Sequence, residues 1–270
     1  MANNVSAVSV ENIFSTACKL PSCKIDRVEF LTRELKNRVS PAQLADALAN
    51  GTVIAKIPVT ILDSIAGGSI KLETSKVTLL STVAGIPGGF AMIGTVPSDL
   101  AQFYAHVFRI AQKLAYIYGS KELDLSDGTQ NVIMLYLGVM FGVNAASAAL
   151  AKLAAANAAK IGARVASKPL TKYAIYNISK KILAWIGVKL TKDAFGKAIS
   201  KSIPFVSGFL SGGLSVATYL PMAKKLQKEL TKLAAMSPDD LVEASEAADI
   251  ILANFADVTD EPPVNEDEVI

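Results

Sequence analysis

Polar side chains recur at helical spacing in residues 98–118, and they are the part of the chain best suited to chemistry. At about 100° per residue, Asp99, His106 and Lys113 fall on one line, with Gln102 and Arg109 about 60° to its side. Such a stripe could form an internal polar network or bind the polar head of a lipid. The simplest alternative is the water-facing side of an amphipathic helix. A general base at His106 needs a polarising partner and a nucleophile, and the sequence offers neither, so we predict no catalytic residue.

Other chemical motifs fail on inspection. The pair Gly196-Lys197 resembles the end of a phosphate loop, but Thr191 stands where such a loop needs glycine. One histidine and two cysteines, Cys18 and Cys23, are too few for the common zinc sites. We therefore predict no metal and no cofactor, and we expect reduced thiols, with a disulfide between the two cysteines as the alternative.

Charge is distributed unevenly along the chain. All 27 Lys and Arg lie in residues 1–234, whereas residues 235–270 hold 11 of the 24 acids and no base. Residues 152–232 carry 15 bases against two acids, and 14 of those bases are lysine. Lysine suits lipid headgroups, whereas base reading favours arginine, so we predict anionic membrane lipid as the partner and no nucleic acid. The alternative is a solvated surface that the acidic tail neutralises. The candidate lipid-binding residues are Lys152, Lys160, Arg164, Lys168, Lys180, Lys181, Lys224, Lys225, Lys228 and Lys232.

Three charge-free runs, at 77–98, 128–151 and 202–223, are each long enough to cross a bilayer. Hydrophobic residues make up 51% of the chain, and its mean hydropathy is +0.37. Each run contains glycines four residues apart, a spacing that lets helix backbones pack closely in membranes or in soluble cores. Membrane hairpins and core packing both fit this pattern. The residues singled out for either role are Gly85, Pro87, Gly88, Gly89, Gly138, Gly142, Gly208, Gly212 and Gly213.

No stretch alternates like a strand, so we predict an all-α helical bundle with glycine-rich apolar hairpins. Two short helices are expected at 9–38, broken near Pro21. Ser40 and Ser237 each open a further helix with a capping pattern, the first ending at Gly51. The spacing G-G-x7-P occurs twice, which suggests an internal repeat with helices at 98–118 and 222–236. The predicted units are 1–39, a helical domain at 40–235, a C-terminal helix at 236–256 and an acidic disordered tail at 257–270.

Two separate glycine and proline blocks carry a family resemblance. The first is Gly85-Ile-Pro-Gly-Gly89, followed by Pro97-Ser-Asp-Leu100 and the helix to Tyr118-Gly119; the second is Ile203-Pro-Phe-Val-Ser-Gly208, Gly212-Gly213 and Tyr219-Leu-Pro-Met-Ala-Lys-Lys225. In order and spacing they resemble the EcsC family of bacterial proteins, over residues 40–235. The resemblance implies a bacterial or phage-borne helical protein without established enzymatic activity. The positions it emphasises are Gly85, Pro87, Gly88, Gly89, Pro97, Asp99, Gly119, Gly213 and Pro221.

Together these patterns favour a non-enzymatic protein on the cytoplasmic side of the cell membrane. Its lysines would bind anionic lipid and its hairpins would enter the bilayer, either to perturb the membrane or as an accessory to transport or secretion. A membrane protein or a second copy of the chain is a further candidate partner, and the acidic tail could compete for the lysines. No secretory signal is expected, because no basic residue and apolar run open the chain. The alternatives are a soluble helical carrier or sensor of an apolar ligand, and an enzyme whose Asp99, His106 and Arg109 act on a lipid headgroup.

Overall fold

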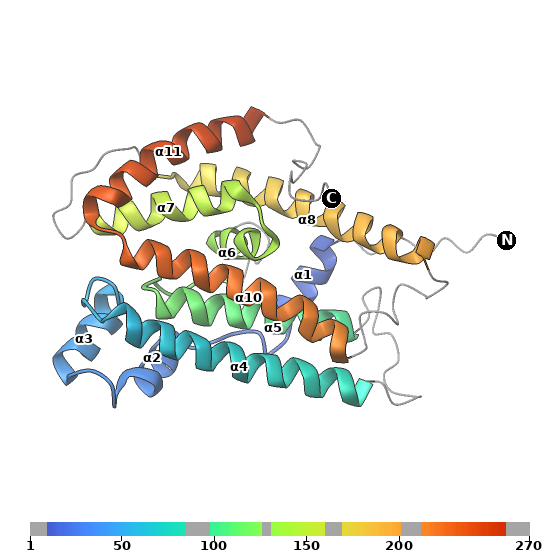
Figure 1. Ribbon diagram of the computed structural model, residues 1–270, viewed down its shortest axis with the longest axis horizontal. Coiled ribbons are helices and arrows are strands. Elements are labelled where there is room, and N and C mark those ends of the chain that lie inside the picture. Colours follow the sequence, from blue (N-terminus) through green and yellow to red (C-terminus); the bar gives the residue numbers. More distant parts are fainter. Residues whose placement is uncertain (1–9, 85–97, 126–130, 160–168, 201–211, 258–270) are drawn as a thin grey trace.

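The computed structural model describes residues 10–84, 98–125, 131–159, 169–200 and 212–257, and within these ranges it contains ten helices and no strand (Figure 1). The all-α prediction is confirmed. The helices are α1 (Val10–Lys19), α2 (Arg27–Leu35), α3 (Pro41–Asn50), α4 (Val59–Ala84), α5 (Ser98–Ile117), α6 (Val132–Phe141), α7 (Asn144–Ala159), α8 (Lys172–Ser200), α10 (Gly212–Ala235) and α11 (Pro238–Asp257).

The N-terminal helices end and begin where their capping residues predict. Asp26 accepts a hydrogen bond from the Glu29 backbone at the start of α2, and Ser40 and Gln43 form a capping box at the start of α3. Gly51 ends α3 with φ +108°, a conformation that favours glycine. The two short helices expected at 9–38, and the helix that ends at Gly51, are confirmed.

Helix α6 lies near the centre of the molecule and appears almost end-on in Figure 1. Eight of its ten residues are buried, and it packs against α5, α7, α8 and α10. The run at 128–151 therefore contains two helices, α6 and α7, and both contribute to the protein core. Ten residues of helix span only about 15 Å, half of a bilayer's hydrocarbon thickness. Within the described parts of the chain, no helix combines the length and apolar character needed to cross a membrane.

The glycine pair of this run has two different roles. A Cβ at Gly138 would lie 2.6 Å from the Ala146 Cβ and 3.0 Å from the Ile182 Cδ1, so Gly138 allows α6 to pack closely on α7 and α8. Gly142 ends α6 in the left-handed conformation, with φ +88°. Core packing is thus the interpretation that holds for Gly138. The block at 85–89 and Gly208 lie outside the described residues, and Gly212 and Gly213 begin α10.

Helices α4, α5 and α10 form the layer below α6 in Figure 1. The Asp63 carboxylate of α4 accepts hydrogen bonds from the Tyr118 hydroxyl at 2.5 Å and from the Thr231 hydroxyl of α10 at 2.6 Å. Helix α5 begins at Ser98, as the first copy of the repeat predicts. The helix predicted at 222–236 from the second copy is wrong in its start, because α10 begins at Gly212 and continues through Pro221.

Helix α11 packs along the alanine-rich α7 on the opposite side of the molecule. Ser237 caps it as predicted, accepting a hydrogen bond from the Asp240 backbone while the Asp240 carboxylate accepts one from the Ser237 backbone. Lys152 of α7 donates to Asp249 of α11 and is only 3% exposed. Its prediction as a lipid-binding surface residue is wrong, because its ammonium group is held by α11.

Candidate functional site

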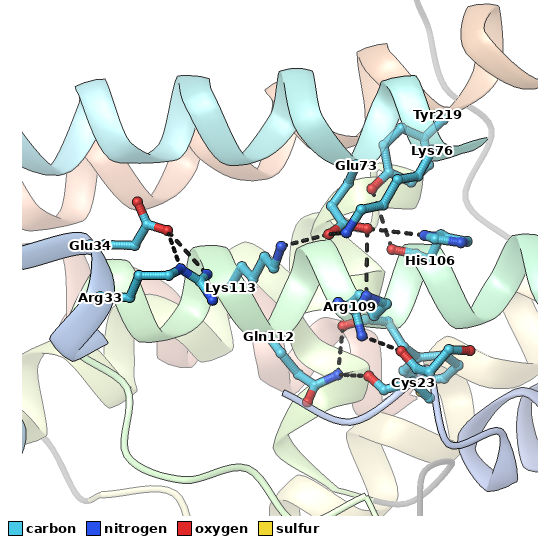
Figure 2. A network of polar contacts seen from close by, with 12 residues as sticks. Cys23, Arg33, Glu34, Glu73, Lys76, His106, Arg109, Gln112, Lys113 and Tyr219 are labelled. Carbon is cyan, nitrogen blue, oxygen red and sulfur yellow. Dashed lines mark hydrogen bonds and ion pairs between the residues drawn. The ribbon is translucent and has the colours of Figure 1, made fainter. Parts of the chain in front are cut away.

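Three polar residues of α5 face α4 and surround the side chain of Glu73. Helices α4 and α5 pack together, and Glu73 lies in the middle of α4 with its side chain fully buried. His106, Arg109 and Lys113 lie on successive turns of α5, so one face of the helix presents all three to α4. Figure 2 shows their side chains converging on the Glu73 carboxylate.

Four cationic or ionisable side chains contact the two oxygens of Glu73. Its Oε1 accepts from Lys113 Nζ at 2.5 Å and from Lys76 Nζ at 3.2 Å. Its Oε2 lies 3.0 Å from His106 Nδ1 and 3.5 Å from Arg109 Nε. An ionised carboxylate only accepts hydrogen bonds, so His106 carries its proton on Nδ1. We call Glu73, Lys76, His106, Arg109 and Lys113 the Glu73 network.

The charges of this network keep Glu73 ionised. Burial by itself would raise the pKa of Glu73, but hydrogen bonds from His106 and Lys113, together with the charges of Lys113 and Arg109, hold that pKa well below its ordinary value. Burial lowers the pKa of Lys113; the contact with Glu73 opposes this, and the charges of Arg109 and Lys76 add to it. A carboxylate with a depressed pKa is a weak base and has no proton to donate at neutral pH, and its two oxygens already contact three cations and His106. The arrangement therefore suits binding and positioning better than acid–base chemistry.

Further contacts tie the network to neighbouring segments. Arg109 donates from Nη1 to the backbone oxygen of Ser22. Gln112 donates to the Cys23 oxygen at 2.9 Å and accepts from the Ile25 backbone at 3.1 Å. On the other side, the Tyr219 hydroxyl of α10 donates to the backbone oxygen of His106 at 3.3 Å. The α1–α2 connection and α10 are therefore both fastened to α5 at this point.

The two cysteines lie beside this connection. Both are free thiols, as expected from the sequence. Contact with the Cys23 thiol, followed by burial, raises the pKa of Cys18, whereas contact with Cys18 and the charge of Arg109 lower the pKa of Cys23. Among the described residues, no three His, Cys, Asp or Glu side chains lie close enough to hold a metal ion.

The structure brings together part of the predicted stripe. His106, Arg109 and Lys113 meet at Glu73, and His106 and Lys113 are only 7% and 3% exposed, so the alternative of a water-facing surface is wrong. Gln102 is half-buried and is not among the described groups that contact Glu73, and the side chain of Asp99 lies outside the described residues. Glu73 itself is not among the residues predicted from the sequence. Its signal is an acid on the buried stripe of α4, three residues after Ile70 and four before Val77.

A second candidate site is the exposed face of α10. Lys224, Lys228 and Lys232 follow one another at four-residue spacing, and all three are exposed. Lys225 is also exposed, and its Nζ lies beside Gly142, where the carbonyl end of α6 attracts a cation. The only acid on α10 is Glu229. We call Lys224, Lys225, Lys228 and Lys232 the α10 lysine face.

The remaining predicted lipid-binding residues are placed less uniformly. Lys180 is exposed, and its Nζ lies 5.4 Å from the ring centre of Tyr176, which is itself exposed. Lys181 donates to the backbone oxygen of Phe255 at 3.1 Å, so α11 holds part of its ammonium group. Lys160, Arg164 and Lys168 lie outside the described residues.

Comparison with protein-family models, curated proteins and solved structures finds no match for this chain. The resemblance to the EcsC family therefore stays a prediction from the sequence, and the function must be argued from the residues themselves.

Proposed function

We propose that the protein is a non-enzymatic membrane-binding protein that attaches to anionic lipid on the cytoplasmic side of the cell membrane. The observation that supports this most directly is the α10 lysine face, in which four exposed lysines share one helix with a single acid. Lysine ammonium groups remain hydrated and flexible, which suits diffuse attraction to lipid phosphates.

The first turns of α8 add a second surface of the same character. Tyr173 is 74% exposed and follows the exposed Lys172, and Tyr176 is 36% exposed and lies beside the exposed Lys180. Tyrosine rings are favoured at the boundary between lipid and water, where the ring is apolar and the hydroxyl is hydrated. Exposed tyrosines beside lysines therefore favour lipid over a purely polyanionic partner.

The size of the electrostatic attraction is sufficient for reversible binding. Each basic residue close to an anionic bilayer contributes about 1 kcal/mol, so the α10 lysine face would contribute about 4 kcal/mol. Stable attachment needs a second contribution. In this proposal it comes from α8 and from the apolar runs at 77–98 and 202–223, much of which lie outside the described residues.

Charge reversal on α10 tests the proposal. The variant K224E/K228E/K232E should bind vesicles containing anionic lipid at least about 100-fold more weakly than the unaltered protein, because three favourable contributions of about 1 kcal/mol are lost. The matched control K19E/K36E/K121E changes the net charge equally at exposed positions on other elements. Sedimentation with vesicles measures both. Equal losses in the two variants would refute a specific lysine face.

Fractionation of the protein expressed at native level tests where it acts. Release of membrane-bound protein by high salt is expected if lysines hold it at the surface, and resistance to salt and alkaline carbonate is expected if the apolar runs also insert. A protein that stays in the supernatant throughout would refute membrane attachment and favour a soluble carrier.

A further inference from the structure

The Glu73 network contains more positive charge than its carboxylate can balance. Lys76, Arg109 and Lys113 are cationic, and among the described residues Glu73 is the one carboxylate that contacts them, which leaves an excess of about two positive charges. Buried charges in proteins are normally paired, because moving an unbalanced charge away from water is costly. An ion pair that served only to join α4 to α5 would need one cation. The surplus points to an additional anion.

Exposure identifies the side from which an anion would enter. The side chains of Glu73, Lys113 and His106 are 0%, 4% and 8% exposed, whereas Arg109 is 18% and Lys76 is 40% exposed. The network is therefore closed around Glu73 and open at Lys76 and Arg109. These two residues come from different helices and meet at the same carboxylate, so an anion that contacts both would sit at the open edge.

Both residues at the open edge have donors to spare. Among the described residues, Arg109 uses Nε toward Glu73 and Nη1 toward Ser22, and its Nη2 has no hydrogen-bond partner. Lys76 uses one of its three ammonium protons toward Glu73. A guanidinium beside an ammonium is a combination that proteins use for phosphate.

We infer that the open edge of the Glu73 network binds a phosphate group, with Lys76 and Arg109 as its ligands and Glu73 as the buried counter-ion that balances part of their charge. A phosphomonoester is the favoured class, because its charge approaches −2 at neutral pH and matches the surplus of the network. The group could belong to a lipid headgroup or to a free phosphate compound. The site extends the proposed function but does not depend on the α10 lysine face.

Inorganic phosphate is the first probe. The midpoint of thermal unfolding should rise with phosphate concentration beyond the rise in sodium chloride of equal ionic strength, as expected for a ligand that binds the folded state. Lys76→Gln should weaken the apparent phosphate affinity about fivefold to tenfold, because one charged ligand is lost. Lys71→Gln is the matched control, since Lys71 is an exposed lysine of α4 that does not contact Glu73. Equal phosphate responses in the two variants, or a response no larger than that to chloride, would overturn the inference.

A second variant tests the role assigned to Glu73. Because its carboxylate competes with phosphate for the same cations, Glu73→Gln should bind inorganic phosphate more tightly than the unaltered protein, by at least about threefold. Phosphate should also restore part of the stability that this variant loses. Weaker binding in folded Glu73→Gln would contradict the role of counter-ion. The Lys76→Gln comparison keeps the inference testable if Glu73→Gln does not fold.

Vesicles distinguish the two sources of phosphate. Compared at equal lipid charge, vesicles with a phosphomonoester headgroup should bind the protein more tightly than vesicles with a phosphodiester headgroup if the ligand is a lipid. Lys76→Gln should then remove that preference. If the protein binds both kinds of vesicle equally well and phosphate still stabilises it, the ligand of the site is a free phosphate compound. If K224E/K228E/K232E binds vesicles as tightly as the unaltered protein, the proposed function is refuted and the phosphate site is not. If phosphate does not stabilise the protein, only the phosphate site is refuted.

Discussion

Replacing Glu73 by glutamine is the sharpest test of how α4 and α5 are joined. The substitution keeps the shape of the side chain and removes its charge. Lys113 and Arg109 would then face each other near a neutral amide, with Lys113 only 3% exposed. The cost falls mainly on these two cations.

The expected loss of stability is about 3 kcal/mol. Removing one member of a buried ion pair costs about 3–5 kcal/mol, because the remaining charge is left without compensation. The lower end applies here, since Arg109 keeps its bond to the Ser22 oxygen and Lys113 lies 5.6 Å from the ring centre of Phe30. For a chain of this size, about 3 kcal/mol corresponds to a fall of roughly 6–12 °C in the unfolding midpoint. By comparison, Lys76→Met should cost about 0.5 kcal/mol, because its ammonium group reaches water.

Urea unfolding followed by circular dichroism in phosphate-free buffer measures these free energies. The double variant E73Q/K113M should recover about 2 kcal/mol relative to the sum of the single changes, because it no longer buries an unpaired ammonium group. A Glu73→Gln protein within 1 kcal/mol of the unaltered one would refute the reasoning. The reasoning would also be refuted if the loss of unfolding free energy in E73Q/K113M equalled the sum of the losses in the two single variants.

Three further predictions follow from the same structure. Since the pKa of Glu73 is depressed, its ion pairs stabilise the folded protein fully above the ordinary pKa of 4.5, and this stabilisation is lost as the pH falls below that value. The free energy of unfolding should therefore fall more steeply with decreasing pH in the unaltered protein than in Glu73→Gln. Parallel pH profiles of the two proteins would contradict this. Gly138→Ala should lose about 1–2 kcal/mol in urea unfolding despite the better helix propensity of alanine, because its Cβ would lie 2.6 Å from the Ala146 Cβ; an unchanged midpoint would show that α6 and α7 can separate without cost. Deleting residues 257–270, which contain six acids and no base, should increase vesicle binding at low salt if the tail competes for the lysines; unchanged binding would exclude that competition.

The sequence predicted the helices best where local chemistry decides their ends. Ser40 and Ser237 accept hydrogen bonds from the first turns of α3 and α11, and Gly51 has a positive φ that ends α3. The prediction failed at Pro221, which lies inside α10. Proline lacks only one backbone donor, and packing against α4, α5 and α6 stabilises the helix across that gap.

The candidate site could be predicted only in part, because Glu73 lies on α4 whereas His106, Arg109 and Lys113 lie on α5. Spacing within α5 placed His106, Arg109 and Lys113 on one face, but it could not show whether that face meets water or protein. The answer depends on Glu73, which is 33 residues before His106 and 40 before Lys113. Nothing local to α5 encodes that partner. An acid at an apolar-stripe position of α4, in line with Ile70 and Val77, is the signal that would have paired the two segments.

Helix α10 links the two proposed sites without making them one. Its inner side is fastened to the α4–α5 pair twice, by Tyr219 to the backbone of His106 and by Thr231 to Asp63. Its outer side carries Lys224 and Lys228 between those two attachments. Substitutions on the outer side therefore change charge and leave the attachments intact, whereas loss of Glu73 weakens the support beneath one of them. For this reason the defect in lipid binding expected for K224E/K228E/K232E should come without a change in the urea midpoint, whereas Glu73→Gln should lower that midpoint.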